Sequence, residues 1–396
     1  MSISRDPQKI HELLTRGVAE IYPTKEALEK LLLSGKRMRL YMGVDPTSPY
    51  LHIGHALQLR KLRQFQDLGH EVILLIGSFT GMIGDPTDKT AARKRLTRAE
   101  VMTNAKTYKK QASKILSFTG THAAKMMFND KWLSRFTFAD VLDLAGHFTI
   151  QQLIQRDMFQ RRLQEDKPIS LPEFLYPLMQ GYDSVAMDVD LEIGGSDQTF
   201  NMLVGRTLMK ALKNKEKFVM TLKLLTNDEG KKMSKSEGGC IALSDTPEEM
   251  FGKIMAMDDS VIIPYFELAT DVPVNEIEKL QKAMKGGVNP RDLKARLART
   301  VVALYHSAAV ADKAAAHFVR VFQAKEKPSD MPTVKARGTI VDVLVVAKIA
   351  ASKTDARRLI AQGGVKVDDV VVTDVEMTVK HGSVIQKGKR YFVRAI

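Results

Sequence analysis

The stretch LYMGVDPTSPYLHIGHALQL, Leu40 to Leu59, decides the fold predicted for this chain. Its apolar start, Leu40 to Val44, predicts a buried strand, and the prolines at positions 46 and 49 end it. A helix is predicted from about Gly54 to Leu68. Because a strand, a turn and a helix N-terminus place backbone N–H groups at the positive end of the helix dipole, this order favours a phosphate site.

Two histidines stand at the start of that helix. His52 and His55 are three residues apart, so they lie roughly on one helix face. Gly54 has no side chain and lets a nucleotide approach the backbone. Two imidazoles aimed at one point can donate hydrogen bonds to a phosphate whose charge grows during a reaction. Taken alone, the pair is equally well explained as a helix cap and a surface residue.

Length and composition indicate a broad class. The 396 residues suffice for two or three domains, and a hydrophobic content of 44% suffices for a large core. Helix-type and strand-type apolar patterns alternate, which predicts an α/β protein. The single cysteine, Cys240, excludes a disulfide framework and a multi-cysteine zinc site and fits a reducing compartment. The net charge of +14 favours a polyanionic partner.

The sequence also predicts where the protein works. No apolar run reaches the roughly 18 residues needed to span a bilayer, so we expect no membrane association. The N-terminal residues Arg5, Asp6, Lys9 and Glu12 interrupt any apolar core, so we expect neither a secretory signal nor a transit peptide. These features together predict a cytoplasmic protein.

The first 240 residues predict a Rossmann-like parallel sheet. Val72 to Ile76 predicts a second buried strand, which leads into the glycine-rich loop Gly77 to Pro86. Strand, helix and strand in this order form a βαβ unit, which places ligands at the C-terminal ends of its strands. Further strands are predicted at 125–128, 188–193 and 218–222. Two helices are predicted within residues 6–35 and one long helix over 97–118, with a capping box at its start.

Three more segments have unusual patterns. Phe136 to Glu165 predicts apolar helices that are either core or a subunit interface. Tyr176, Gln180 and Asp183 share one face of a predicted helix, either as a ligand-facing stripe or around a tyrosine hydrogen-bonded in the core. The loop GKKMSKSEGG, residues 230–239, flanks three lysines with glycines and predicts a mobile cationic loop, although a Lys-rich loop can also be a solvated surface.

The remaining residues predict separate parts. We expect a catalytic domain over residues 1–240 with a helical insertion at about 97–166, a helical domain over 241–323, a polar linker over 324–338 and a small α+β domain over 339–396. From Met331 onward the chain has twelve Lys/Arg and six Asp/Glu, a net charge of +6. This excess of positive charge favours a polyanionic partner for the small domain.

HIGH at 52–55 together with KMSKS at 232–236 resembles the class I aminoacyl-tRNA synthetases. The segments YMGVDPT at 41–47, IGDP at 83–86, YPLMQGYD at 176–183 and GGSDQ at 194–198 resemble the bacterial tyrosyl-tRNA synthetases among them, in a compact branch. SKTDARRLIAQGGVKV and GKRYFVR near the end resemble a small RNA-binding domain shared with a ribosomal small-subunit protein. The resemblance covers essentially the whole chain.

The resemblance implies a tyrosine–tRNA ligase. ATP and L-tyrosine would form tyrosyl-adenylate and pyrophosphate, and the tyrosyl group would then pass to the 3′ end of tRNA(Tyr). ATP is a substrate, with Mg²⁺ expected beside it and no protein-held metal site. The helical domain would lie on the anticodon side of the tRNA, the domain at 339–396 would bind RNA, and the segment Phe136 to Glu165 would form a homodimer.

Residue roles follow by position from the resemblance. Tyr41 and Asp183 would hold the phenolic hydroxyl of tyrosine, Asp85, Tyr176 and Gln180 its ammonium group, and Gln198 its carboxylate. Catalytic contacts are expected from Thr47, His52, His55, Lys232 and Lys235. ATP contacts are expected from Asp45, Gly54, Asp197 and Lys235. RNA contacts are expected from Lys353, Arg357, Arg358, Lys389 and Arg390.

Some residues depart from the common pattern, and other functions share parts of it. Met42, Gln58 and Glu192 stand where other members carry different residues, which puts the ribose and neighbouring contacts in question. A tryptophanyl-tRNA synthetase is disfavoured because an indole has no phenol for Tyr41 and Asp183. A small-metabolite nucleotidyltransferase is disfavoured by the basic C-terminal domain, and an inactive RNA-binding protein by the intact HIGH and KMSKS motifs.

Overall fold

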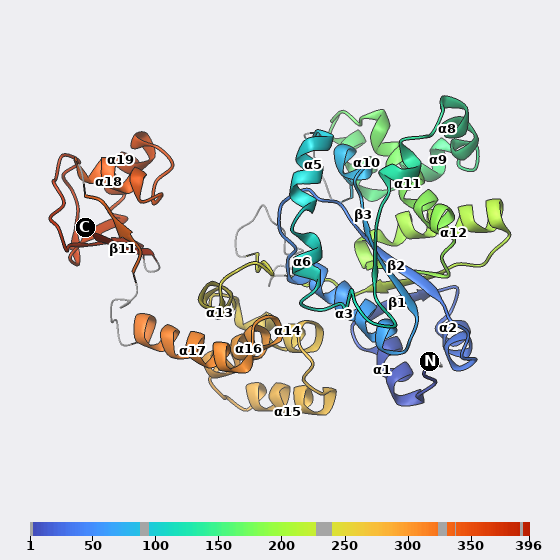
Figure 1. Ribbon diagram of the computed structural model, residues 1–396, viewed down its shortest axis with the longest axis horizontal. Helices are drawn as coiled ribbons and strands as arrows, with labels where there is room; N and C mark the ends of the chain where they lie inside the picture. The colour runs from blue at the N-terminus through green and yellow to red at the C-terminus, as the bar shows by residue number, and fades with distance from the viewer. Residues whose placement is uncertain (1–2, 88–94, 227–239, 324–330, 337, 389–390) are drawn as a thin grey trace. The chain divides into compact units, whose positions relative to one another are not determined.

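The computed structural model describes residues 3–87, 95–226, 240–323, 331–336, 338–388 and 391–396. The chain divides into two compact units, Met1–Ala311 and Asp312–Ile396 (Figure 1). The α/β fold predicted from the sequence is confirmed, with a mainly parallel sheet in the first unit and a small α+β fold in the second.

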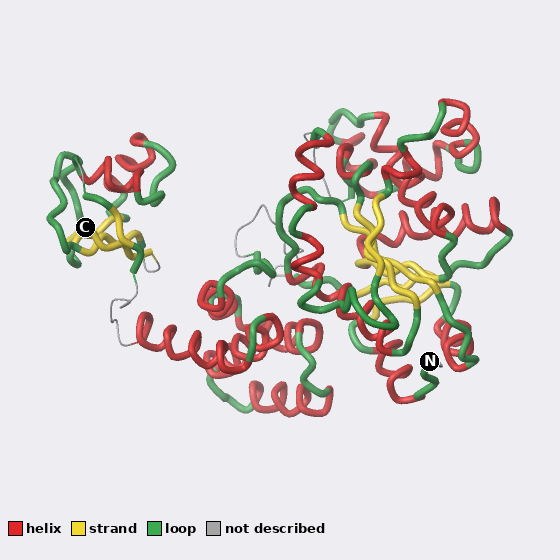
Figure 2. Tube along the Cα trace, viewed as in Figure 1, coloured by secondary structure: helices red, strands yellow, loops and turns green. Residues whose placement is uncertain are grey.

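A six-stranded sheet forms the centre of the first unit, with the order β1-β6-β5-β2-β3-β4 (Figure 2). All neighbouring pairs run parallel except β1 with β6. The inner strands are apolar and buried on both faces, as expected of a parallel sheet covered by helices. The strands are β1 (Val18–Tyr22), β2 (Arg39–Val44), β3 (Glu71–Ile76), β4 (Lys125–Phe128), β5 (Leu191–Gly195) and β6 (Phe218–Leu222).

The pairing of β2 with β5 is short and determines where a ligand can enter. It includes Leu40 with Leu191 and Tyr41 with Glu192, and no later pair. Beyond these residues β2 continues beside β3, and β5 continues beside β6. The strand order therefore continues in opposite directions on the two sides of this pair. At such a topological switch point, parallel sheets have a crevice at the carboxyl ends of the strands.

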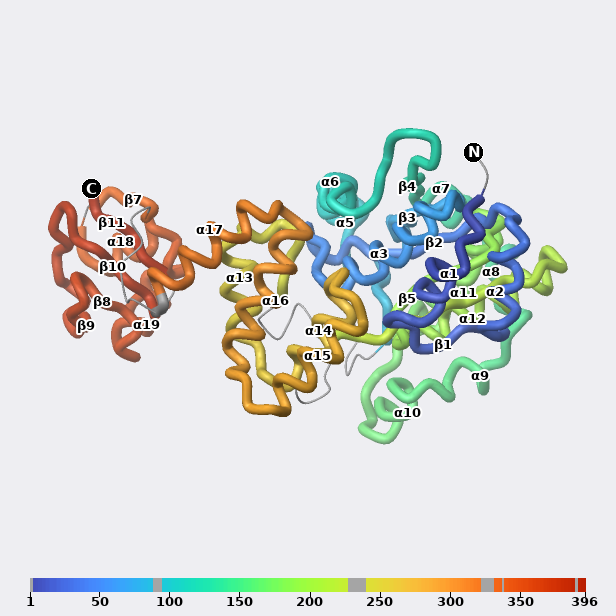
Figure 3. Tube along the Cα trace, turned by 90° about the horizontal axis from the view of Figure 1, so that it is seen from below, coloured from blue at the N-terminus to red at the C-terminus, as the bar shows by residue number. Residues whose placement is uncertain are grey.

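Helices surround this sheet (Figures 1 and 3). Glycines let α11 and α12 approach closely, since a Cβ on Gly181 would lie 2.8 Å from Val204 Cγ1 and 3.1 Å from Gly205 N. The helices before β6 are α1 (Pro7–Thr15), α2 (Lys25–Leu33), α3 (Ile53–Asp67), α4 (Thr80–Ile83), α5 (Arg98–Ala105), α6 (Tyr108–Ala112), α7 (Asp130–Leu133), α8 (Phe138–Ala145), α9 (Ile150–Ile154), α10 (Asp157–Gln164), α11 (Leu171–Met187) and α12 (Thr199–Lys213).

A helical part follows the sheet and lies beside α3 in the same unit (Figure 3). Buried side chains such as Phe251, Phe266 and Leu297 pack its helices together. Its helices are α13 (Pro247–Met255), α14 (Ile262–Ala269), α15 (Val274–Lys285) and α16 (Pro290–Tyr305), and α17 (Ala308–Phe318) crosses the boundary between the two units.

Two predictions for the first unit were wrong in detail. The segment over 6–35 contains the strand β1 as well as two helices, because Val18 to Tyr22 pairs with β6 at the edge of the sheet. The long helix over 97–118 is broken between α5 and α6. At the break, Thr107 Oγ1 donates to Pro49 O at 2.7 Å and Tyr108 OH donates to Ser48 O at 2.8 Å. These tertiary hydrogen bonds hold the turn before HIGH and outweigh helix propensity.

The second unit has a five-stranded sheet with the order β7-β11-β10-β8-β9. Ile340, Leu344, Ile360 and Ile385 are among its buried core residues. Its elements are β7 (Thr333–Val334), α18 (Ile340–Val346), α19 (Lys353–Ala361), β8 (Val365–Val367), β9 (Val370–Val371), β10 (Val384–Lys387) and β11 (Tyr391–Ala395). The segment 333–334, assigned to the linker by its composition, pairs in parallel with β11 and so belongs to this sheet. Among the described helices, none has the length and apolar character needed to cross a membrane.

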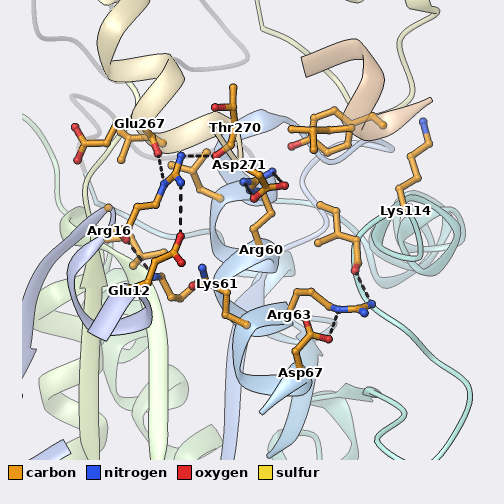
Figure 4. A pocket seen from close by; sticks show the side chains of 18 residues that line it. Glu12, Arg16, Arg60, Lys61, Arg63, Asp67, Lys114, Glu267, Thr270 and Asp271 are labelled. Atoms are coloured by element: carbon orange, nitrogen blue, oxygen red, sulfur yellow. Dashed lines mark hydrogen bonds and ion pairs between the residues drawn. The ribbon is translucent and has the colours of Figure 1, made fainter. Parts of the chain in front are cut away.

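A polar cavity of about 310 Å³ lies between α1, α3, α14 and α16 (Figure 4). Arg16 donates to the carbonyl oxygens of Phe266, Glu267 and Thr270, at the C-terminal end of α14. Arg60 on α3 pairs with Asp271. These cations tie the helical part to α1 and to the helix that begins with HIGH.

Lys61 lies at the wall of this cavity and is 5% exposed. Its Nζ donates to Leu13 O at 2.7 Å and to Arg16 O at 3.1 Å, where α1 ends. Burial lowers the pKa of Lys61 from 10.5 to about 7. The folded protein therefore holds this proton less tightly than the unfolded chain does.

We predict that Lys61 gives the folding stability a pH dependence that Lys61→Met removes. Between pH 7 and the unfolded pKa, the unfolded chain binds the extra proton, so the free energy of unfolding rises with pH by at most about 1.4 kcal/mol per unit. Below pH 7 Lys61 is protonated in both states and its contribution no longer changes. Urea unfolding from pH 6 to 9 should show a smaller slope in Lys61→Met, with the exposed Lys30→Met as control. Equal slopes in all three proteins contradict the prediction.

Candidate active site

The predicted site residues gather where the strands end at the switch point. Asp45 follows β2, Asp85 follows the short helix α4 that comes after β3, and Asp197 and Gln198 follow β5. Tyr176, Gln180 and Asp183 lie on α11. The hydrogen bonds described below connect residues from these separate segments, as the carboxyl-end rule for parallel sheets predicts.

The two histidines are oriented by the backbone at the start of α3. Gly54 N donates to His52 Nδ1 at 3.1 Å, and His52 N donates to His55 Nδ1 at 3.2 Å. The rings stack with their centroids 3.8 Å apart. Because each Nδ1 accepts a hydrogen bond, the neutral ring carries its proton on Nε2, which can donate to a phosphate. A Cβ on Gly54 would lie 3.0 Å from the His52 ring, so a larger residue would displace it.

The chain that follows the KMSKS motif is anchored beside His52. Ile53 N donates to Ile241 O at 2.9 Å, and Leu243 N donates to Leu51 O at 2.8 Å. Lys114 Nζ also holds this segment by donating to Leu243 O at 2.6 Å. Lys232 and Lys235 themselves lie outside the described residues.

Two side chains with buried polar groups, Tyr41 and Asp183, lie beside the switch point. Tyr41 is 0% exposed, and its OH lies 3.0 Å from Ser184 Oγ. Asp183 is 3% exposed and accepts hydrogen bonds from Trp132 Nε1 at 2.7 Å and Asn129 Nδ2 at 3.2 Å. Burial raises the pKa of Asp183 well above its ordinary value, although both donors act in the opposite direction. Burial likewise raises the pKa of the Tyr41 phenol.

A cluster of hydrogen-bonded polar side chains lies around Asp45. Its Oδ2 accepts from Tyr176 OH at 2.8 Å, and its Oδ1 accepts from Thr80 Oγ1 at 2.7 Å. Gly77 is needed beside it, because a Cβ there would lie 1.9 Å from Asp45 Oδ1. Thr47 N donates to Asp45 O at 2.8 Å, so the turn into HIGH is folded around this aspartate.

A third group joins the loops after β3 and β5. Gln198 Nε2 donates to Asp85 Oδ2 at 2.7 Å, and Thr87 Oγ1 donates to Asp85 Oδ1 at 2.6 Å. Asp197 lies against Gly195, where a Cβ would be 2.4 Å from its Oδ1. Gln180 does not join these groups, because its Nε2 donates to Glu192 Oε1 at 3.1 Å.

Sequence reasoning missed several residues that complete the site. Asn129 and Trp132 follow directly after β4, so the carboxyl-end rule applied to that predicted strand would have indicated them. Thr80 and Ser184 carry no such signal, since their roles depend on tertiary contacts. Of the residues that depart from the common pattern, Met42 is buried in β2 at 1% exposed.

The predicted RNA contacts lie in the second unit. Lys353, Arg357 and Arg358 are exposed on α19. Lys353 Nζ lies 2.8 Å from Asp342 Oδ1, and Arg358 Nη2 lies 2.6 Å from Asp355 Oδ1. Exposed ion pairs of this kind are weak and leave the cations open to phosphates. Lys389 and Arg390 lie outside the part of the chain that the structure describes.

Comparison with known proteins agrees with this geometry. The family model for class I tRNA synthetases (W and Y) matches residues 33–323, and that for the tyrosine–tRNA ligase SYY-like C-terminal domain matches residues 323–394. The tyrosine–tRNA ligase of Moorella thermoacetica is 46% identical over 392 residues, which cover 96% of this chain and 94% of the relative. That of Thermotoga maritima is 46% identical over 394 residues, which cover 98% and 97%.

A solved structure shares the fold of most of this chain. The tyrosyl-tRNA synthetase complexed with L-tyrosine from Archaeoglobus fulgidus is 25% identical with a TM-score of 0.61, and the match covers 78% of this chain and 100% of that one. The ordered motifs, the crevice at the switch point and these similarities agree. The chain therefore belongs to the class I tyrosyl-tRNA synthetase family, whose members are tyrosine–tRNA ligases.

Proposed function

We propose that L-tyrosine binds in the crevice with its phenol at Tyr41 and Asp183. The observation that supports this most is the burial of two polar side chains beside the switch point, Tyr41 on β2 and Asp183 on α11. Buried polar groups need partners, and a phenolic hydroxyl supplies one. Asp85, Tyr176 and Gln180 would face the ammonium group, and Gln198 the carboxylate.

We propose that ATP binds across the start of α3. Its phosphates would contact Thr47, His52 and His55, its ribose would contact Asp197, and Asp45 and Gly54 would line its site. Lys232 and Lys235 would add positive charge. ATP carries Mg²⁺ as part of the substrate. Among the described residues no group of three His, Cys, Asp or Glu side chains is placed to hold a metal ion, so we assign the ion to the phosphates of the nucleotide.

The first step needs no protein nucleophile. The tyrosine carboxylate is ionised near neutral pH, and its oxygen forms a bond to the α-phosphorus while the bond to pyrophosphate breaks. The protein aligns the two reactants and stabilises the charge that moves onto the pyrophosphate. The Nε2 donors of His52 and His55 suit that role, and removing one such donor costs about 2.7–4 kcal/mol by analogy with oxyanion donors.

The second step transfers the tyrosyl group from the adenylate to a ribose hydroxyl at the 3′ end of tRNA(Tyr), and AMP leaves. We propose that the helical domain at 241–323 lies on the anticodon side of the tRNA and that the domain at 339–396 adds RNA contacts from α19. Because charging serves translation, we propose that the protein works in the cytoplasm.

Substrate selection can be tested directly. We predict that tyrosine supports exchange of labelled pyrophosphate into ATP, and that tryptophan and phenylalanine do not. The phenol adds a hydrogen bond to Asp183 and brings a hydroxyl to Tyr41, whereas phenylalanine has no hydroxyl to offer either of these buried groups. Exchange with tryptophan but not with tyrosine would reassign the substrate.

Asp183→Asn should weaken tyrosine use far more than ATP use. The amide keeps the shape but loses the charge-assisted hydrogen bond, which is worth about 1.5–3 kcal/mol, or about 10- to 150-fold in kcat/KM for tyrosine. KM for ATP should change less than about twofold. Steady-state exchange kinetics measure both values, and equal losses for tyrosine and ATP would remove Asp183 from its proposed role.

The exposed cations of α19 should affect tRNA binding and leave tyrosine activation unchanged. We predict that Lys353→Ala/Arg357→Ala raises KM for tRNA and lowers the salt dependence of tRNA binding, because about two phosphate contacts are lost. Pyrophosphate exchange should stay unchanged. Aminoacylation and filter binding at several salt concentrations measure the effect, and a loss of exchange activity in the folded variant contradicts the domain assignment.

We propose a homodimer through the segment Phe136 to Glu165. The segment has one buried side, where Leu144 packs into a core cluster with α11 and α12. It also exposes large apolar side chains that would be costly in a monomer. These are Phe138 at 78%, Leu142 at 56%, Ile150 at 73% and Leu163 at 50% exposed.

Charging this apolar surface should separate the subunits. We predict that Phe138→Asp/Ile150→Asp is a monomer in analytical ultracentrifugation, because each carboxylate would have to be buried in the interface. Val274→Asp on α15, where valine is 52% exposed, is the matched control and should remain a dimer. A dimer in both variants would place the interface elsewhere.

A further inference from the structure

A buried arginine connects the two chain segments that carry Asp85 and Gln198. Arg156 is 8% exposed and stands immediately before α10. Its Nη2 donates to Thr87 Oγ1 at 2.9 Å, and its guanidinium carbon lies 4.8 Å from the centroid of the Phe200 ring. Thr87 is two residues after Asp85, and Phe200 is two residues after Gln198. One guanidinium therefore contacts both segments whose side chains meet in the proposed tyrosine site.

The hydrogen bonds that lead from this arginine to Asp85 have only one possible direction. A guanidinium carries donors and no acceptor, so Thr87 Oγ1 accepts from Arg156. The hydroxyl of Thr87 has a single hydrogen, which it gives to Asp85 Oδ1 at 2.6 Å. An ionised carboxylate only accepts, in agreement with that direction. The order from Arg156 through Thr87 to Asp85 is therefore fixed by the chemistry of the groups at both ends.

The carboxylate of Asp85 has most of its acceptor positions filled by the protein. Its Oδ1 accepts from Thr87 Oγ1 and also from Thr87 N at 3.0 Å, and its Oδ2 accepts from Gln198 Nε2 at 2.7 Å. A carboxylate offers about four such positions, two on each oxygen. Counted over the hydrogen bonds of the described residues, about one position remains, and it lies on Oδ2. This is the position that a substrate ammonium group needs.

The helix that begins after Arg156 is itself fixed to α11, which carries the other proposed ammonium contacts. Arg162 on α10 and Glu173 on α11 are 1% and 6% exposed and form two parallel hydrogen bonds of 2.7 and 2.9 Å. The Phe159 and Phe174 rings pack beside them, with their centroids 4.6 Å apart. The guanidinium carbon of Arg156 lies 5.7 Å from the centroid of the Phe159 ring. The arginine is therefore held by a well-packed element.

Packing alone is a weak explanation for an arginine at this place. Removing a guanidinium from water costs several kcal/mol, and an aliphatic side chain could fill the space beside Phe159 and Phe200. Arginine adds a planar group that lies over an aromatic ring and at the same time reaches Thr87 with an N–H donor. Both properties are used here, and both act on segments that lead into the proposed site.

We propose that Arg156 is a positioning residue for the ammonium group of the amino acid. Through Thr87 it holds the carboxylate of Asp85 so that Oδ1 is occupied by the protein and Oδ2 is left for Gln198 and the ammonium group. This inference rests on the proposed tyrosine site. Arg156 touches no substrate itself, and its effect is on the α-ammonium group rather than on selection of the side chain.

Tyrosine-dependent pyrophosphate exchange tests this role. We expect Arg156→Met and Thr87→Val each to raise KM for tyrosine about tenfold, the equivalent of one hydrogen bond. The ammonium contact is the same before and during the reaction, so kcat and KM for ATP should change less than about twofold. Thr87→Ser keeps the hydroxyl and should stay within about twofold of the wild type. Arg37→Met, which removes an exposed arginine, is the matched control and should also stay within about twofold.

Two further readouts separate positioning from simple structural support. The double variant Arg156→Met/Thr87→Val should raise KM for tyrosine about tenfold and not a hundredfold, because both residues act in one chain of hydrogen bonds. Competitive inhibition isolates the ammonium group. Thr87→Val should weaken tyrosinol, which has an ammonium group, about tenfold, and 3-(4-hydroxyphenyl)propionate, which has none, less than about twofold. A pocket that is merely loosened would lose affinity for both inhibitors.

Thermal unfolding establishes which variants are folded. Arg156→Lys keeps the buried charge but not the planar fork, so it should raise KM for tyrosine about threefold, and it serves where Arg156→Met does not fold. The proposal is overturned by an unchanged KM for tyrosine in folded Thr87→Val or in the folded variants of Arg156. Additive losses in the double variant, or equal losses for the two inhibitors, overturn it as well.

Asp85→Asn distinguishes this failure from failure of the site itself. If Asp85→Asn weakens tyrosinol and Thr87→Val does not, Asp85 still binds the ammonium group and only the positioning role of Arg156 is lost. If Asp85→Asn leaves tyrosinol binding unchanged, the ammonium site is wrongly assigned and the inference falls with it.

Discussion

The early end of pairing between β2 and β5 is the constraint on which the site depends. The pairing stops at Tyr41 and Glu192, so these two residues form the last pair before the two strands separate. Backbone groups beyond that point have their partners on β3 and β6, and the space between the strands is left to side chains and substrate. Two buried side chains with polar groups, Tyr41 and Glu192, therefore lie side by side where the strands separate.

The local sequence pattern was enough to predict those helices and strands whose own residues favour them. The strand β2, the helix α3 and the capping box at Thr97 have apolar runs or caps that tertiary contacts reinforce. It was not enough for β1 or β7, which are strands only because another strand lies beside them. The break before α6 likewise depends on hydrogen bonds from Thr107 and Tyr108 to a turn about 60 residues away. Such contacts cannot be found by periodicity.

The site was predictable to a similar extent. Motifs identify residues that would touch substrate, since their spacing reflects a strand end or a helix face. They do not identify the groups that orient those residues. Trp132 and Asn129 hold Asp183, and Thr80 holds Asp45, through contacts between segments that are distant in the sequence. Glu192 could be noted as a departure, but its partner Lys217 was visible only in three dimensions.

The charge pattern of the proposed site would let a strongly basic chain bind both an amino acid and a triphosphate. In the proposed site, Asp85 and Asp183 lie on the amino-acid side, and the imidazole donors of His52 and His55 lie at the start of α3. An ammonium group is attracted to the first set and phosphates to the second, so each substrate is favoured at one end and disfavoured at the other. In the proposed site, this opposition would bring the tyrosine carboxylate toward the α-phosphate although both are negative. Orientation, rather than a reactive side chain, is therefore the main contribution of the protein to the first step.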